Sequence, residues 1–254
     1  MTRLLYRLYE WRLTRKIVHQ PLPRHIGLIL DGHRRFARAT GMSVLAGYAL
    51  GADKTEELLR WCTALGIPTV TVWLLSTENL ERDADEVRAI LGVLEKRISD
   101  WARNGLAAEL GMQIRPIGKL DLLPPAALDV LRHAERSTRE HSRLRVNVAV
   151  GYGGRQEIVD AVRACLRDRE PCSIEIAINA LTPDAVAKYL YTYDCPDPDL
   201  IIRTSGELRL SGFMLWQSAH SEFYFCDALW PQFRRTDFLR AIVSYQARHR
   251  RFGL

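Results

Sequence analysis

The stretch HIGLILDGHRRFAR, residues 25–38, gives the clearest indication of the fold of this chain. Its first six residues are a short apolar run, which is typical of a buried β-strand. The run ends abruptly at Asp31 and Gly32, and an arginine-rich segment suited to a helix follows. A strand that passes through a glycine turn into a helix opens a β-α unit, so the stretch predicts an α/β protein.

The same pattern recurs along the chain. Further strand-like runs occupy residues 69–75, 112–117, 144–150, 200–203 and 222–226. Amphipathic stretches of helical length occupy residues 46–65, 83–104, 125–141, 155–168, 182–189 and 237–250, the last with Asp237 as its expected cap. Strands that alternate with helices pair in parallel. We therefore expect a single α/β domain with a central, mostly parallel six-stranded sheet flanked by helices on both faces.

Composition excludes several classes of protein. Of the 254 residues, 47% are hydrophobic and 26% are charged, which excludes disordered and fibrous chains. The five cysteines are odd in number and form no C-x-x-C pair, as is typical of reduced thiols in a cytosolic protein. The net charge of +6 favours an anionic partner, but no nucleic-acid-binding motif is present, so we do not expect nucleic acid. No apolar run approaches the ~20 residues of a membrane span, and we expect a cytoplasmic protein.

Residues 1–20, MTRLLYRLYEWRLTRKIVHQ, form a separate amphipathic segment. Leu4, Leu8 and Trp11 share helical spacing, and basic residues occupy the other faces. We expect a basic helix that packs on its own domain or on a dimer partner. Peripheral contact with a membrane surface is the alternative interpretation.

Chemistry is expected where the strands end, because ligands of open α/β sheets bind outside the carboxyl ends of the strands. At the first of these ends, Asp31 offers a carboxylate for a hard cation, Gly32 lets the backbone approach a ligand, and Arg34 and Arg35 add positive charge. This combination suits a magnesium-bound diphosphate. An ordinary Asp-Gly turn followed by a solvated helix face is the structural alternative.

A second anion site is indicated after the fifth strand. Arg203, Arg209 and Ser211 place two guanidinium groups and a hydroxyl around a Ser-Gly turn, which suits another phosphate group. Two anion sites indicate two phosphorylated substrates. No glycine-rich nucleotide motif is present, and we interpret GYGGR at residues 151–155 as a tight strand-to-helix turn.

Five ordered blocks of the sequence resemble the cis-prenyltransferases, the undecaprenyl diphosphate synthase family. The blocks are PRHIGLILDGHRRFAR, WLLSTENLERD, VNVAVGYGGRQEIVDA, PDPDLIIRTSGELRLSGFMLWQSAHSEFYF and LWPQFRRTDFLRA. The resemblance covers nearly the whole chain and implies a catalytic domain over residues 21–254. It also implies a homodimer that uses Mg²⁺ to condense isopentenyl diphosphate with an allylic diphosphate. The hydrocarbon tail needs a hydrophobic tunnel between the sheet and helices, which residues 46–65 and 83–104 are apolar enough to line.

The resemblance also implies roles for individual residues. Asp31 would hold the magnesium diphosphate, while Gly32, Arg34, Arg35 and Phe36 would contact the allylic substrate. Isopentenyl diphosphate would be bound by Arg203, Arg209 and Ser211. The metal site would be completed by Glu222, which in this family can reach across from a second subunit. The loop that closes over the substrates would be organised by Ser76, Glu78, Asn79 and Arg82.

Several positions depart from the usual pattern of the family. His33 stands in place of an asparagine that takes part in proton removal, and an imidazole could serve there as a base. Phe36 replaces a tryptophan, Val44 and Tyr48 replace the usual basic and histidine residues, and His220 replaces a tyrosine. The residues at 44, 48 and 220, together with the overall similarity of the five blocks, resemble the short-chain Z-farnesyl diphosphate synthases of actinobacteria.

Product length and the end of the chain give two further expectations. Leu74 stands where long-chain members have alanine, and we expect it to narrow the tunnel. Growth from geranyl diphosphate would then end at about fifteen carbons, because a close-packed wall yields little. The ending Arg251-Phe252-Gly253-Leu254 resembles a tail that crosses the dimer interface to a substrate diphosphate in some members; a frayed, basic helix end is the alternative.

Two other functions compete with chain elongation. Irregular coupling or cyclisation of prenyl units is suggested by His33. A non-catalytic subunit of a prenyltransferase complex is disfavoured, because Asp31, Arg35 and Arg203 are all present.

Overall fold

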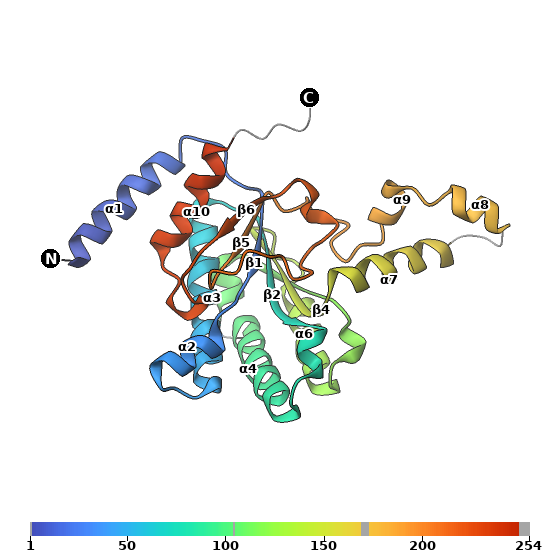
Figure 1. Cartoon of the computed structure of the whole chain (residues 1–254), viewed down its shortest axis with the longest axis horizontal. Helices are drawn as coiled ribbons and strands as arrows, with labels where there is room; N and C mark the ends of the chain where they lie inside the picture. Colours follow the sequence, from blue (N-terminus) through green and yellow to red (C-terminus); the bar gives the residue numbers. More distant parts are fainter. Residues whose placement is uncertain (1, 104, 169–172, 249–254) are drawn as a thin grey trace.

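The computed structural model describes residues 2–103, 105–168 and 173–248. At its centre lies a parallel sheet in the strand order β3-β4-β2-β1-β5-β6 (Figure 1). The strands are β1 (His25–Ile29), β2 (Thr69–Ser76), β3 (Met112–Ile117), β4 (Leu144–Tyr152), β5 (Leu200–Arg203) and β6 (Glu222–Phe225). The predicted α/β fold with a six-stranded sheet is confirmed, and all its strand pairs are parallel.

Helices connect and cover the strands. Those of eight residues or more are α1 (Thr2–Ile17), α2 (His33–Thr40), α3 (Val44–Leu65), α4 (Ala84–Arg103), α6 (Pro125–Thr138), α7 (Gly154–Arg167) and α10 (Arg235–Ala247). The shorter ones are α5 (Leu106–Leu110), α8 (Ile174–Asn179), α9 (Pro183–Ala187), η1 (Glu78–Glu81), η2 (Leu120–Leu122), η3 (Gln217–His220) and η4 (Trp230–Gln232).

The predicted helix boundaries need two corrections. The segment expected to be helical over residues 182–189 is the shorter α9, and α8 was not expected. The last helix begins at Arg235, so Asp237 is not its cap but its third residue. There the Asp237 carboxylate accepts a hydrogen bond of 3.0 Å from the backbone N–H of Arg234, which satisfies a donor that the helix start leaves unpaired.

The two faces of the sheet have different cores. On one face, alternate strand residues such as Leu28 and Val72 pack against α3, α4, α6 and α10 in the main hydrophobic core. On the other face, Ile29 and Ile201 meet Phe213 and Met214, which precede β6. α7 projects toward α8 and α9 on one side of the molecule, while α1 extends from the opposite side (Figure 1). The large core therefore lies between the sheet and the helices that precede and follow β2.

Helix α1 packs on α10, in agreement with the interpretation that we favoured. Ile17 is fully buried, its carbonyl oxygen accepts a hydrogen bond of 3.0 Å from Gln246, and the Tyr9 hydroxyl accepts one of 3.3 Å from Arg240. Leu8 and Trp11 stay exposed.

Two further observations bear on the expected class of protein. None of the helices that the structure describes combines the length and apolar character that a bilayer crossing requires. Nor does a disulfide join the four cysteines within the described residues. The tail at residues 251–254 lies outside the described part of the chain.

Candidate active site

Three adjacent strands bring the predicted site residues to one edge of the sheet. β2, β1 and β5 are parallel neighbours, with Ile29 level with Trp73 and with Arg203. The loops after these strands therefore meet. A cavity of about 820 Å³ opens between them, and the predicted residues from all three loops line it. This volume is ordinary for a small-molecule site.

The turn from β1 into α2 is shaped by Gly32. Its φ of +112° lies in a region that residues with side chains rarely adopt, and a Cβ there would lie 3.1 Å from the Leu229 backbone. The turn is also fixed by Thr204, whose hydroxyl oxygen accepts a 3.0 Å hydrogen bond from the Asp31 N–H. As a result, the first amides of α2 lie beside Asp31, where a helix start favours an anion.

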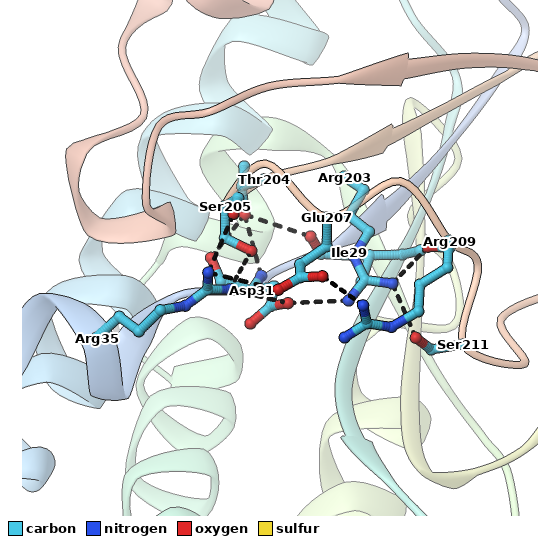
Figure 2. A network of polar contacts seen from close by, with 9 residues as sticks. All are labelled: Ile29, Asp31, Arg35, Arg203, Thr204, Ser205, Glu207, Arg209 and Ser211. Carbon is cyan, nitrogen blue, oxygen red and sulfur yellow. Dashed lines mark hydrogen bonds and ion pairs between the residues drawn. The ribbon is translucent and has the colours of Figure 1, made fainter.

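Asp31 and Arg203 form the centre of the site (Figure 2). One guanidinium nitrogen of Arg203, Nη2, donates to Asp31 Oδ2 at 2.9 Å. The other, Nη1, donates to Ser211 Oγ at 2.8 Å and to the carbonyl oxygen of Arg209. The Arg203 side chain is only 5% exposed. Burial raises the pKa of Asp31, but hydrogen bonds from Arg203 and Ser205 and the nearby arginine charges outweigh it, so the pKa lies below its usual value and the carboxylate is ionised.

The ion-pair network continues from Asp31 to Arg35, whose Nη2 lies 3.5 Å from Asp31 Oδ2 (Figure 2). Arg35 Nη2 donates to Ser205 Oγ at 2.5 Å, and Arg35 Nη1 lies 3.5 Å from Glu207 Oε1. Glu207 also pairs with Arg209. Ser205 and Ser211 both have positive φ, 79° and 51°, and this conformation is often found at ligand sites. Ser205 and Glu207 were not predicted as site residues from the sequence, although both belong to the stretch RTSGELRLS at residues 203–211.

The loop after β2 forms the cavity wall opposite Asp31 and Arg203. We call the part of the cavity between Asp31, Arg203 and the loop residues Ser76 and Arg82 the mouth. Ser76 Oγ accepts a 3.1 Å hydrogen bond from the Asn79 N–H and so fixes the start of η1. Burial opposes ionisation of Glu78, but hydrogen bonds from its own backbone, Ser76 and Thr77 lower its pKa. Arg82 Nη1 donates to Glu86 Oε1 at 3.0 Å.

Glu86 joins this wall to the neighbouring helices. The carboxylate oxygen that Arg82 binds also accepts a 3.3 Å hydrogen bond from the Tyr48 hydroxyl and lies 3.7 Å from Arg34. Glu86 was not predicted as a site residue from the sequence. Its spacing of four residues from Arg82 could have indicated an ion pair, but nothing in the sequence shows that Tyr48 and Arg34 lie beside it.

His33 lies in a tight space between α2 and α3. A Cβ at Gly51 would lie only 2.2 Å from His33 Nε2, so the imidazole occupies room that only glycine leaves. The Tyr48 ring is 5.1 Å from the imidazole, centre to centre. Burial lowers the pKa of His33 to about 4, against the opposing charge of Asp31. The imidazole is therefore neutral at neutral pH.

Behind the mouth, the cavity continues as an apolar passage. It runs between α3 and α4 and over β2, and is lined there by side chains that include Leu74, Ala52, Ile90 and Leu94. Its position agrees with the tunnel predicted between the sheet and these two helices.

Two predicted residues lie elsewhere. Phe36 is buried and is not among the described residues that line the cavity. Glu222 begins β6 level with Leu200, at the amino ends of the strands, so within one chain it lies at the opposite edge of the sheet from Asp31. Its carboxylate accepts a hydrogen bond of 2.5 Å from Arg248. One chain alone therefore does not bring these two carboxylates together.

Comparison with known proteins agrees with this geometry. The family described as "Putative undecaprenyl diphosphate synthase" matches residues 29–253. An isoprenyl transferase of Deinococcus radiodurans is 52% identical over 96% of this chain and 90% of its own length. A (2Z,6E)-farnesyl diphosphate synthase of Thermobifida fusca is 50% identical over 98% and 97%.

A solved structure shares the fold. Lavandulyl diphosphate synthase from Lavandula x intermedia, in complex with dimethylallyl diphosphate, superposes with a TM-score of 0.82 at 32% identity, covering 92% of this chain and 99% of that one. The parallel sheet, the arginine-rich mouth and the match over most of the chain lead to one conclusion: this chain belongs to the undecaprenyl diphosphate synthase family and is a prenyltransferase.

Proposed function

We propose that this protein condenses isopentenyl diphosphate with a short allylic diphosphate, geranyl diphosphate above all, to give a short-chain Z-prenyl diphosphate such as (2Z,6E)-farnesyl diphosphate. The observation that carries this proposal is the continuity of the cavity. Its mouth presents Arg35, Arg203 and Arg209, and its interior is largely apolar. A molecule with a diphosphate head and a hydrocarbon tail matches both parts.

Different residues at the mouth bind the two substrate diphosphates. The first amides of α2 and Arg35 hold the allylic diphosphate, and Arg203, Arg209 and Ser211 hold the diphosphate of the isopentenyl substrate. Fixed positive groups stabilise the charge that develops on the departing diphosphate, and the isopentenyl double bond attacks the resulting allylic centre. A proton is then lost from the isopentenyl unit, and in this proposal the neutral His33 imidazole, which lines the cavity, accepts it.

The donor set fits Mg²⁺. This ion is usually bound in proteins by one or two carboxylates together with substrate phosphates, so the single ionised Asp31 suffices when a diphosphate is present. No group of three or more His, Cys, Asp or Glu side chains that could hold a metal ion occurs among the described residues. Arg203 also keeps a buried Nε without a hydrogen-bond partner, so its guanidinium has a donor left for a substrate oxygen. When bound, the metal would neutralise diphosphate charge.

We also propose that two copies of the chain form a homodimer. Glu222 lies far from its own chain's Asp31 by strand register, so it could complete a metal site only in a partner subunit. Contact of α1 with a membrane surface, through its exposed Leu8 and Trp11, is a further part of the proposal.

Turnover with defined substrates tests the proposed function. The protein is supplied with isopentenyl diphosphate, Mg²⁺ and one allylic diphosphate of five, ten or fifteen carbons, and release of diphosphate is followed. We expect turnover that requires both substrates, fastest with the ten-carbon partner. Turnover with dimethylallyl diphosphate alone would favour irregular coupling, and no turnover with any pair would favour a non-catalytic subunit.

Leu74→Ala is expected to lengthen the products. The side chain lies in the cavity wall, so removing three carbons widens the passage. Product length is measured by mass spectrometry. Leu200→Ala is the matched control, because Leu200 is buried in β5 and is not among the described cavity residues. The control should lose about 2–5 kcal/mol of stability without any change in products. Unchanged products from a folded Leu74→Ala would show that Leu74 only fills core.

His33→Asn is expected to change the acid limb of the pH profile. If His33 accepts the proton, activity of the free enzyme falls as pH drops through about 4, where the imidazole becomes charged. This limb lies well below the ~6.5 of an exposed histidine, because burial disfavours the charged ring. The measurement is kcat/KM against pH for both proteins. Identical profiles would make His33 a bystander, and a linear product in place of an irregular one would favour irregular coupling by the wild type.

A further inference from the structure

The far end of the apolar passage carries a charged side chain. Along α4 the cavity lining continues through Val93 and Leu94 to Arg97, Ile98 and Trp101. Arg97 is the unexpected member, because an unpaired guanidinium is a poor neighbour for a hydrocarbon. Its place at the end of the passage therefore needs a physical account.

Arg97 is bound across the gap between α4 and α3. Its Nη1 donates to Glu56 Oε1 at 2.7 Å, and its Nη2 donates to Asp53 Oδ1 at 2.6 Å. The same Glu56 oxygen accepts a hydrogen bond of 2.9 Å from Trp101 Nε1, and Trp101 is almost fully buried. We call Arg97, Asp53 and Glu56 the distal clamp. Two carboxylates and a buried indole hold it in one geometry.

The distal clamp lies well beyond the diphosphate mouth. Near the mouth, α3 and α4 are joined by the hydrogen bond from Tyr48 to Glu86. Arg97 follows Glu86 by eleven residues on the same helix, which corresponds to about 16 Å along α4. Leu74, by contrast, is only two residues from Ser76 at the mouth. Leu74 thus narrows the passage from the sheet side, and the distal clamp closes its end.

We propose that the distal clamp limits chain growth beyond Leu74, with Arg97 as the residue that determines the longest product once Leu74 no longer narrows the passage. This inference rests on the proposed prenyl condensation. A tail that grows past Arg97 must push the guanidinium away from Glu56 and Asp53 or lie against it. The first outcome breaks ion pairs and leaves charges unpaired in a partly buried place, and the second buries a charge against hydrocarbon. Both outcomes oppose the addition of another five-carbon unit, although the residues at the mouth could still catalyse it.

Arg97→Met tests the proposal, because methionine keeps an unbranched side chain and removes the charge. The variant is made in the wild-type protein and in Leu74→Ala, and products are analysed with excess isopentenyl diphosphate. We expect the main product to grow by at least one five-carbon unit in the Leu74→Ala background. The matched control is Arg60→Met on α3, which removes an exposed ion pair with Glu109 outside the cavity lining and should leave the products unchanged.

The result that overturns the proposal is a folded Arg97→Met whose product lengths match its parent in both backgrounds. If Arg97→Met does not fold, Arg97→Gln replaces it, since its amide can still hydrogen bond to Glu56. The Leu74→Ala protein gives an independent measurement. Its affinity for prenyl diphosphates should rise with tail length only up to its own longest product, and a continued rise beyond it would contradict the proposal. Absence of any condensation by the wild type would instead contradict the proposed function.

Discussion

Replacing Asp31 should abolish turnover. We expect Asp31→Ala and Asp31→Asn to lose about 1,000-fold or more in kcat with Mg²⁺, because the carboxylate is the only one proposed to hold the metal diphosphate within the chain. The alanine variant also leaves the buried guanidinium of Arg203 without its counter-charge, so it should be less stable. Asp31→Asn also removes the counter-charge, but it keeps the size of the side chain and an oxygen that can accept the hydrogen bond from Arg203, so it should be more stable than the alanine variant.

A binding measurement tests the role of Asp31 separately from turnover. Asp31 now neutralises Arg203, so the asparagine variant should bind inorganic diphosphate more tightly than wild type when a chelator removes divalent cations. The matched control is Asp85→Ala, a largely exposed carboxylate at the start of α4 that pairs with Arg88. It should behave as wild type in both assays. Near-normal turnover by a folded Asp31→Asn would refute the assignment.

Replacing Arg203 by lysine should be almost as damaging. The guanidinium spans Asp31, Ser211 and the Arg209 carbonyl at once, and a single ammonium group cannot reach all three. We expect kcat/KM for isopentenyl diphosphate to fall about 100-fold, as when one fixed donor to a developing charge is lost.

Arg115→Lys is the control for this substitution. Arg115 lies in β3 and pairs with Asp194, outside the described cavity lining. Its replacement should leave kcat/KM unchanged. Wild-type kinetics from Arg203→Lys would mean that Arg203 supports the loop rather than the substrate.

Much of the fold could be predicted because buried apolar residues recur in the sequence with the period of a strand or a helix. The run before Asp31 and the helix after Ser43 were located to within two residues for this reason. Helix α8 could not be, since Ile174, Ile176 and Ile178 stand at every second position and are exposed in the structure. Alternation is the pattern of a strand, and exposed side chains leave no helical face to detect.

Site residues could be predicted where a charged side chain lies at the carboxyl end of a buried strand, as Asp31 and Arg203 do. The acids that pair with other arginines of the site were not predictable, since Glu207 and Glu86 resemble solvated residues until the fold places Arg35 and Arg34 beside them. The shift in the pKa of His33 likewise depends on the packing of α2 against Gly51, which no local pattern shows.

We propose that the arginine-rich mouth and the apolar passage together make a Z-prenyl diphosphate. The most direct test of this proposal is the structure of the product that wild-type protein forms from geranyl diphosphate and isotope-labelled isopentenyl diphosphate. The product is isolated and its length and new double bond are determined by mass spectrometry and NMR. Our account predicts a linear fifteen-carbon diphosphate with a Z double bond in the newly added unit. An E double bond, or a branched or cyclic skeleton, would contradict it.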